Sequence, residues 1–299
     1  KVLAPLARKE KFDVIHGNAE EAFGIGNIAA RTKAAYVFTS HAPNIPTTGM
    51  LEGMLHPIQF LKSVNTYLLR QAMMQADRIV AFSQFSRDLI VKGLGGTEKI
   101  EVIPPGIESS WFEVERNQVD SNRILFWGRI EEEKGLPELF VSLKKVTEKF
   151  TDLKLTLVGE GNRLQEYKTL VTDLGLIKNV EFLGWLSDKE LQSIAAESRF
   201  GIFPSRIESF GLSVVEAMAA GLPVIAARGG AVAENIEEDL TGRLVPVNDP
   251  DALTEAILSL LEDKQSAENR AKAAKTAVRE KFSWEKTADR MFELYQSIT

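Results

Sequence analysis

The stretch RFGIFPSRIESFGLSVVEAMAAGLPVIA (residues 199–226) decides the fold, because it contains a strand, a helix and a second strand in close succession. An apolar run ends at Pro204, an alanine-rich helical segment covers 212–220, and Gly221 leads into a second apolar run. Buried strands that alternate with helices are typical of a parallel sheet with helices on both faces. The same alternation begins at Arg123, so we expect a Rossmann-like domain there.

The predicted strands of this domain are short apolar runs separated by helical segments. They are RILFWG (123–128), LKLTLVG (153–159), VEFLG (180–184), RFGIFP and PVIA. The first third of the chain repeats the pattern less completely, with strands predicted at FDVIH (12–16), AYVFTS (35–40), RIVAFS (78–83) and IEVIPP (100–105). The hydrophilic stretch 113–122 breaks both series and is predicted to be a linker. After Asn248 the chain is expected to be helical to its end.

Composition excludes several classes of protein. The chain has 299 residues, of which 44% are hydrophobic and 26% charged, as in an ordinary globular protein of up to two domains. A net charge of −6 argues against non-specific nucleic-acid binding. The absence of cysteine excludes disulfides and thiolate metal sites, and no apolar run is long enough to span a membrane.

Two acids, Glu208 and Glu216, lie on either side of the start of the 212–220 helix. The free N–H groups at a helix start bind anions, and Gly211 would let a ligand approach the backbone. A carboxylate accepts hydrogen bonds from paired hydroxyls. A phosphate ligand with sugars at both ends therefore fits this segment. The alternative is that Glu208 or Ser209 only caps the helix while Glu216 is solvated.

A second candidate segment is FWGRIEEEKG (126–135), where Arg129 and Lys134 follow a buried strand. Cations at the carboxyl end of a parallel strand are placed to bind phosphate. The alternative is a solvated charged loop, which the three glutamates favour. The sequence DPD at 249–251 looks like a metal-binding motif, but Pro250 suits the first position of a helix, so Asp249 is predicted to be a cap.

Together these segments resemble the retaining glycosyltransferases of family 4. The resemblance rests on the order GRIEEEKG, LTLVGEG, VEFLG, ESFGLSVVEAMAAGLPVIA and TGRLV, with IPPGIE (103–108) similar to a family signature that usually ends in Asp. It implies an α/β protein of the GT-B fold, with two Rossmann-like domains facing across a cleft. The domains would be 1–115, apparently incomplete, and 123–282, with a C-terminal helix at about 283–299 that packs back on the first.

The resemblance also implies a reaction: transfer of a hexosyl group from a UDP- or GDP-sugar to an acceptor hydroxyl, with retention of configuration. The acceptor would be a carbohydrate, a lipid or a small molecule. Neither a cofactor nor a metal ion would be required, because Arg129 and Lys134 would neutralise the donor diphosphate. A sugar-nucleotide epimerase of the same fold, and a fragment that binds nucleotide sugars without transfer, remain alternatives.

The family's functional positions map onto residues of this chain. Glu208, His41, Lys134 and Arg129 would be catalytic, with Glu208 holding donor-sugar hydroxyls and His41 reaching the transferred sugar from the other domain. Glu216 would accept hydrogen bonds from the ribose, and Leu186 would border the base. The donor site as a whole would comprise Gly128, Arg129, Lys134, Leu186, Glu208, Ser209, Phe210, Gly211, Leu212 and Glu216.

Two further expectations follow from the resemblance. The protein would be cytoplasmic, with peripheral attachment to the inner face of the membrane left open. The family normally has a longer N-terminal part with a glycine-rich loop. We therefore expect self-association, or a further N-terminal segment, to cover an exposed sheet edge.

Overall fold

The structure is a computed structural model that describes residues 9–22, 24–41, 67–95, 98–116 and 121–299. The chain divides into two compact units, each with its own parallel sheet. Unit 1 comprises Lys1–Pro105 with Glu285–Thr299, and unit 2 comprises Gly106–Trp284. The division therefore falls ahead of the hydrophilic stretch 113–122, and each unit is described separately below.

Unit 1 contains a four-stranded parallel sheet in the order β1-β2-β3-β4. Its strands are β1 (Val14–Asn18), β2 (Ala35–Ser40), β3 (Arg78–Ala81) and β4 (Ile100–Val102). Its helices are the 3-10 turn η1 (Ala19–Ala22), α2 (Ile25–Thr32), a helix over 67–75, α4 (Gln84–Leu94) and α13 (Trp284–Gln296). All four strands match the apolar runs from which they are predicted.

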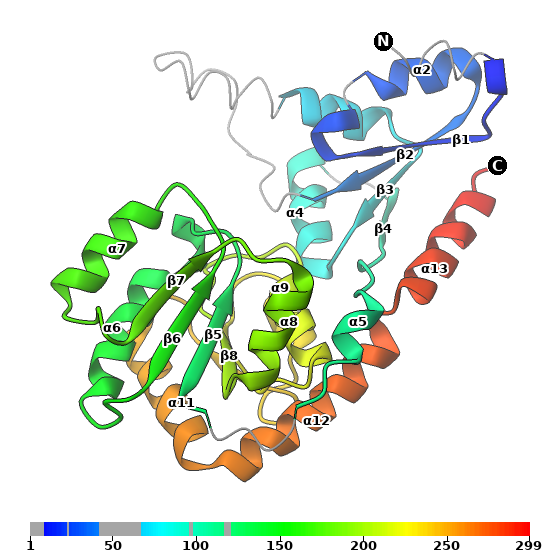
Figure 1. Cartoon of the computed structure of the whole chain (residues 1–299). Coiled ribbons are helices and arrows are strands. Elements are labelled where there is room, and N and C mark those ends of the chain that lie inside the picture. Colours follow the sequence, from blue (N-terminus) through cyan, green and yellow to red (C-terminus); the bar gives the residue numbers. More distant parts are fainter. Residues whose placement is uncertain (1–8, 23, 42–66, 96–97, 117–120) are drawn as a thin grey trace, which may run out of the picture. The chain divides into compact units, whose positions relative to one another are not determined.

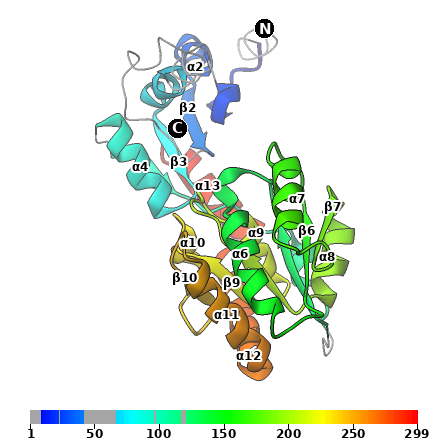
Figure 2. The ribbon, with the colours of Figure 1, turned by 90° about the vertical axis from the view of Figure 1, so that its left-hand side faces the viewer.

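The two faces of this sheet have separate cores. Alternate residues of β2 point to opposite faces, so Phe38 packs with α2 and α4 while Val37 packs with Leu294 of α13. Figures 1 and 2 show α4 and α13 on the two sides of the sheet. The C-terminal helix is thus held to unit 1 by its apolar side chains.

Unit 2 contains a six-stranded parallel sheet in the order β10-β9-β8-β5-β6-β7. Its strands are β5 (Arg123–Trp127), β6 (Lys154–Val158), β7 (Val180–Gly184), β8 (Phe200–Phe203), β9 (Val224–Ala227) and β10 (Arg243–Val245). The order reverses between β5 and β8, which pair with each other. This is the strand order of a doubly wound nucleotide-binding domain, as expected.

Helices cover both faces of this sheet (Figure 1). The first face carries α6 (Leu136–Thr147), α7 (Leu164–Asp173) and α11 (Pro250–Glu262), whereas the second carries α8 (Asp188–Glu197), α9 (Leu212–Ala219) and α12 (Lys264–Lys281). Short helices α5 (Ser109–Phe112) and α10 (Val232–Asn235) and the 3-10 turn η2 (Glu132–Lys134) lie in connections. Figure 2 shows α11 leading directly into α12.

Capping residues fix where two of these helices begin. Ser187 and Glu190 form a reciprocal capping box at the start of α8. The Asp249 side chain accepts hydrogen bonds from the backbone N–H groups of Asp251 and Ala252, and Pro250 occupies the first turn of α11. The prediction that Asp249 is a cap is confirmed.

Residues 106–116 are held to unit 2 by a buried arginine. The Arg116 guanidinium donates to the carbonyl oxygens of Gly221 at 2.6 Å and Ser198 at 2.7 Å, at the ends of α9 and α8. These carbonyls lack partners within their own helices. The contact explains why this segment belongs to the second unit although the sequence analysis assigns residues up to 115 to the first.

Candidate functional site

The carboxyl ends of β5 and β8 form the centre of the candidate site in unit 2. These two strands are neighbours, and the strand order reverses between them. Open α/β sheets bind ligands in the crevice that such a reversal leaves at the carboxyl ends of the strands. Gly128 directly follows β5, and Glu208 lies in the connection that follows β8. The two candidate segments of the sequence therefore meet at one edge of the sheet.

Lys134 and Glu208 form an ion pair at this edge. The Lys134 Nζ donates to Glu208 Oε1 at 2.6 Å, and only 13% and 21% of the two side chains are exposed. The solvated-loop alternative is wrong for Lys134, because it is largely buried. Gly135, the residue after Lys134, packs closely against the connection that follows β8. A Cβ at position 135 would lie only 2.1 Å from the Pro204 carbonyl oxygen, so glycine allows the two loops to approach and Lys134 to reach Glu208.

The start of α9 carries backbone N–H groups that suit a ligand's phosphate. Its N-cap is Gly211, which has a left-handed backbone (φ 85°) and no side chain to cap the helix. The Glu208 carboxylate pairs with Lys134 instead, so the alternative that Glu208 caps this helix is wrong, while the alternative that Ser209 caps it stays a prediction. Phe210 is buried against Phe282, so it presents only its backbone, whereas Leu212 is about half exposed. The N–H of Val214 donates to the Gly211 carbonyl at 3.0 Å, whereas those of Leu212 and Ser213 precede the first helical hydrogen bond, and the helix start carries the positive end of the dipole.

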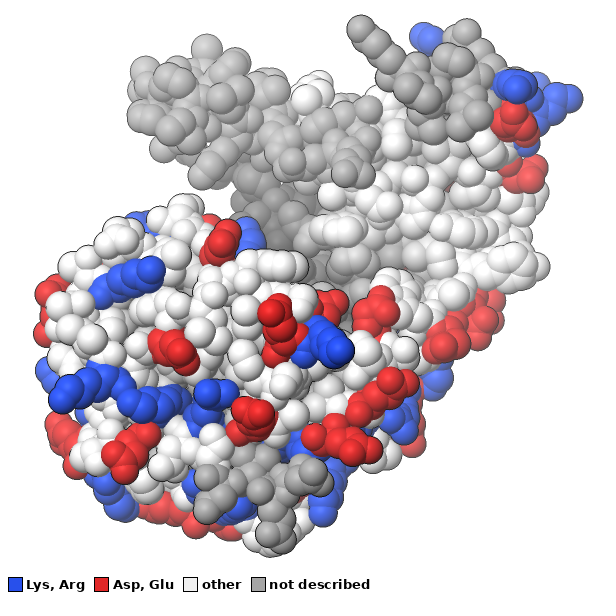
Figure 3. All heavy atoms as spheres, in the orientation of Figure 1, with Lys and Arg blue, Asp and Glu red and all other residues white. Residues whose placement is uncertain are grey.

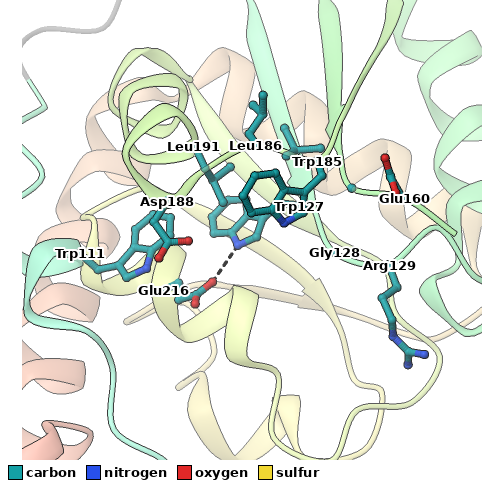
Figure 4. Close-up of a pocket in the computed structure, with 12 residues that line it drawn as sticks. Trp111, Trp127, Gly128, Arg129, Glu160, Trp185, Leu186, Asp188, Leu191 and Glu216 are labelled. Carbon is teal, nitrogen blue, oxygen red and sulfur yellow. Dashed lines mark hydrogen bonds between the residues drawn. The ribbon is translucent and has the colours of Figure 1, made fainter.

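Arg129 is the more accessible of the two predicted cations. Its side chain is 73% exposed, and its guanidinium donates to Glu133 at 3.0 Å within the same turn. In Figure 4 this guanidinium does not point toward Glu216. The solvated-loop alternative thus describes Arg129 in the ligand-free protein, and Arg129 would have to leave Glu133 to bind a phosphate.

A cavity of about 390 Å³ lies beside these groups, entirely within unit 2. Figure 4 shows the side chains that line it, which come from α5, the ends of β5, β6 and β7, and helices α8 and α9. The lining residues are Trp111, Trp127, Gly128, Arg129, Val158, Gly159, Glu160, Trp185, Leu186, Asp188, Leu191 and Glu216. Of the predicted donor-site residues, Gly128, Arg129, Leu186 and Glu216 are among them. The cavity combines flat aromatic rings with carboxylates, a lining that suits a nucleoside.

Glu216 has an unusual environment for a surface carboxylate. Its Oε2 accepts a hydrogen bond from Trp127 Nε1 at 2.8 Å, shown as the dashed line in Figure 4. Burial raises the pKa of Glu216 to about 7; Asp188 adds to this increase, and the Trp127 hydrogen bond opposes it. The alternative that Glu216 is simply solvated is therefore wrong.

Several residues of this cavity are missing from the sequence prediction. Trp111, Trp127 and Trp185 contribute rings, and Glu160 and Asp188 contribute carboxylates. Trp185 is 74% exposed and follows β7 directly. An aromatic residue immediately after a predicted strand was a usable signal. Trp111 lies on a separate short helix, and nothing in the local sequence indicates that it reaches this cavity.

His41 belongs to unit 1 and directly follows β2, where its ring lies 5.0 Å from that of Phe82. Its role at the transferred sugar stays a prediction. The nearby His16 is bonded at both ring nitrogens, to Tyr295 and Thr39 at 2.6 Å each. Burial, and then the charge of His41, lower the pKa of His16. These bonds indicate a structural role for His16.

Metal-ion clusters and membrane-spanning helices are both absent from the described residues. No group of three or more His, Asp or Glu residues in the described parts could hold a metal ion. Among the helices within the described ranges, none has the length and apolar character needed to cross a bilayer. On the face drawn in Figure 3, acidic and basic side chains are interspersed over the described surface of unit 2.

Comparison with known families gives two matches that together cover most of the chain. Residues 108–277 match the model described as glycosyl transferases group 1, and residues 1–111 match glycosyltransferase family 4. An uncharacterized glycosyltransferase of Methanocaldococcus jannaschii is 26% identical over 306 residues, which cover 96% of this chain and 76% of that protein. A D-inositol 3-phosphate glycosyltransferase of Paenarthrobacter aurescens is 31% identical over 74% of this chain and 57% of its own length.

Solved structures show the same fold. The Anabaena protein HepE, in complex with UDP-glucose, superimposes with a TM-score of 0.82 at 22% identity, over 99% of this chain and 81% of that chain. A sucrose-phosphate synthase from Thermosynechococcus elongatus gives 0.83 at 22% identity, over 99% and 76%. The chain spans 56% of the glycogen synthase of Mycobacterium tuberculosis, to which it is 28% identical.

Proposed function

The chain belongs to the glycosyl transferases group 1 family, with the GT-B fold, and from this premise we propose that it is a retaining hexosyltransferase. It moves a hexosyl group from a nucleoside-diphosphate sugar, either a UDP- or a GDP-sugar, to an acceptor hydroxyl. The reaction needs no metal ion. Front-face attack assisted by the leaving phosphate accounts for retention without a covalent intermediate.

One observation carries this proposal: a largely buried lysine and a helix start with glycine at its N-cap lie at the point where the strand order reverses. Lys134 is 2.6 Å from Glu208, and Glu208 lies four positions ahead of the first residue of α9. A diphosphate held there would receive positive charge from Lys134 and from the first-turn N–H groups of α9. Arg129 would add a second cation after releasing Glu133.

The remaining parts of the donor follow from this placement. The nucleoside would occupy the neighbouring cavity, with the ribose at Glu216 and the base bordered by Leu186. Glu208 would turn from Lys134 to the hydroxyls of the transferred sugar. Ser209, Phe210, Gly211 and Leu212 would supply backbone N–H groups. Structures of HepE in complex with UDP and with UDP-glucose support a nucleotide-sugar donor for this chain.

A donor panel tests the proposal. We expect one UDP- or GDP-sugar to bind in isothermal titration and to raise the melting temperature, because a ligand stabilises the state it binds. Transfer to an acceptor should proceed in EDTA, and NMR of the product should show retained configuration. Lys134→Ala and Glu208→Ala should each lower the transfer rate by about 10²-fold or more.

Other outcomes identify the alternatives. Formation of a second sugar nucleotide without any acceptor would indicate an epimerase. Donor binding without transfer to any acceptor would indicate a protein that only binds nucleotide sugars. Absence of heat with every donor at millimolar concentration would contradict the donor site itself.

A further inference from the structure

Trp127 occupies a position that connects the core of unit 2 to the candidate site. It is the last residue of β5, is only 5% exposed, and still lines the cavity. A buried indole N–H needs a hydrogen-bond acceptor, since an unpaired one costs free energy. Here the acceptor is the Glu216 carboxylate, 89 residues further along the chain, at 2.8 Å.

Two aromatic neighbours fix the plane of this indole. Trp111 stacks on it with ring centroids 5.6 Å apart and planes 4° apart, and Phe203 meets it edge-on at 4.8 Å and 84°. Trp111 is itself 2% exposed. An indole held on two sides cannot rotate without displacing its neighbours. The direction in which Nε1 donates is therefore set by packing, before any ligand is present.

The charged residues around Glu216 show why the indole N–H matters for the protonation state of this carboxyl group. Besides Glu216, the charged residues that line the cavity are Arg129, Glu160 and Asp188. The Arg129 guanidinium donates to Glu133 and does not point toward Glu216. Burial and Asp188 both favour the neutral form of Glu216 and raise its pKa, while the Trp127 hydrogen bond favours the ionised form.

We propose that Trp127 is a positioning residue, which fixes one oxygen of an ionised Glu216 and leaves the other to accept hydroxyl groups of a nucleoside ligand. The inference rests on the proposed function, because it assigns Glu216 to the ribose. A carboxylate accepts from paired hydroxyls best when it is ionised and correctly oriented. The Trp127 hydrogen bond favours the ionised form of Glu216 and fixes its orientation.

A purely structural role makes a different prediction. If Glu216 only satisfies the buried indole, replacing Trp127 should lower stability without a change in affinity that depends on pH. Trp127→Phe separates the two roles, because phenylalanine keeps a ring between Trp111 and Phe203 and removes only the donor and part of the ring. The measurement is the affinity for UDP and GDP, by isothermal titration at pH 7 and at pH 9.

The expected loss of nucleotide affinity in Trp127→Phe has a defined size and a defined dependence on pH. Loss of the hydrogen bond should raise the pKa of Glu216 by about one unit from its value of about 7. The ionised fraction at pH 7 then falls from about one half to about one tenth, so the nucleotide should bind about fivefold more weakly. At pH 9 Glu216 is ionised in both proteins, and the difference should shrink to less than about twofold.

Trp111→Phe is the matched control. It makes the same chemical change in the stacked neighbour, whose indole does not donate to Glu216. Trp111→Phe can weaken nucleotide binding, but the ratio of the variant's affinity to the wild-type affinity should be the same at pH 7 and at pH 9. In a Glu216→Gln background, Trp127→Phe should no longer cause a pH-dependent loss. Equal affinities of Trp127→Phe and wild type, or a loss of the same size at both pH values, would overturn the inference.

A second measurement needs no ligand. A ¹³C NMR titration of labelled glutamate carboxylates, with Glu216 assigned from its absence in Glu216→Gln, gives the pKa of Glu216 directly. It should be higher in Trp127→Phe than in wild type and unchanged in Trp111→Phe. If wild type binds neither UDP nor GDP, the proposed function fails and this titration alone decides the inference: an unchanged pKa overturns it.

Discussion

Lys134 and Glu208 neutralise each other, which stabilises two largely buried charges. A buried charge without a partner is costly, so the pair must be replaced rather than simply broken. A donor could replace it, because its diphosphate offers anions to Lys134 and its sugar offers hydroxyls to Glu208. Under the proposed function, binding of a donor would therefore exchange this ion pair for contacts to the ligand.

A double-mutant cycle tests this at the level of stability. Lys134→Ala and Glu208→Ala should each lower the free energy of unfolding by about 1–2 kcal/mol, because each leaves its partner unpaired and largely buried. The double variant should lose clearly less than the sum. Urea unfolding provides the measurement.

The exposed pair of Lys145 and Asp251 is the control for this cycle. Lys145→Ala should change the free energy of unfolding by less than about 0.5 kcal/mol, because exposed ion pairs contribute little. If the Lys134 and Glu208 losses are additive, the two side chains do not support each other in solution.

At the level of helices and strands, Asp249 illustrates how a motif can mislead. Its carboxylate accepts two backbone hydrogen bonds at the start of α11. Asp249→Ala should therefore lower the free energy of unfolding by about 1 kcal/mol, whereas Asp249→Asn should retain most of the stability, because asparagine is a good cap. Thermal unfolding of the three proteins, each with and without Mg²⁺, is the measurement. A wild-type melting temperature that rises with added Mg²⁺, together with an Asp249→Ala variant of full stability that shows no such rise, would favour the metal motif instead.

The nine strands predicted from apolar runs, five of them in unit 2, all form, because buried parallel strands are recognisable as short hydrophobic segments. The tenth, β10, has only three residues and pairs with β9 along one edge, so its local sequence carries too little signal. The bond between Trp127 and Glu216 was beyond sequence reasoning for another reason. It depends on the side-chain rotamers of residues from two different elements, which a single sequence does not specify.

The residues of the candidate site that lie next to a predicted strand or helix could be predicted from the sequence. Those brought together only by the packing of separate elements could not. The cation after β5 and the acid before α9 each follow a recognisable strand, and the fold brings Lys134 and Glu208 together. The aromatic cavity was missed because its rings come from separate elements, including Trp111 on a four-residue helix. The order of the motifs correctly predicts the GT-B fold.

For the whole molecule, the raised pKa of Glu216 makes stability depend on pH. The folded state holds the Glu216 proton up to a pKa of about 7, whereas the unfolded state releases it near 4.5. The folded state therefore binds more protons between these values, and the free energy of unfolding should fall as pH rises through this window, by about 2–3 kcal/mol from this group.

Comparison with Glu216→Gln isolates the effect from other titrating groups, including His16, whose lowered pKa acts in the opposite direction. Urea unfolding at pH 5, 6, 7 and 8 should show wild type losing stability relative to the variant as pH rises. A constant difference between the two proteins across this range would mean that Glu216 titrates normally in the folded state.

The close approach of Gly135 to the Pro204 carbonyl has a consequence for how this protein could acquire new specificities. Any side chain at position 135 would push the two loops apart, and an insertion in that turn would carry Lys134 out of reach of its carboxylate. Substitutions and insertions at this turn should therefore disturb the Lys134–Glu208 pair. Trp185 and Leu186 belong to a different connection, after β7, and line the cavity, so changes at those two positions should alter the lining while the Gly135 contact stays in place.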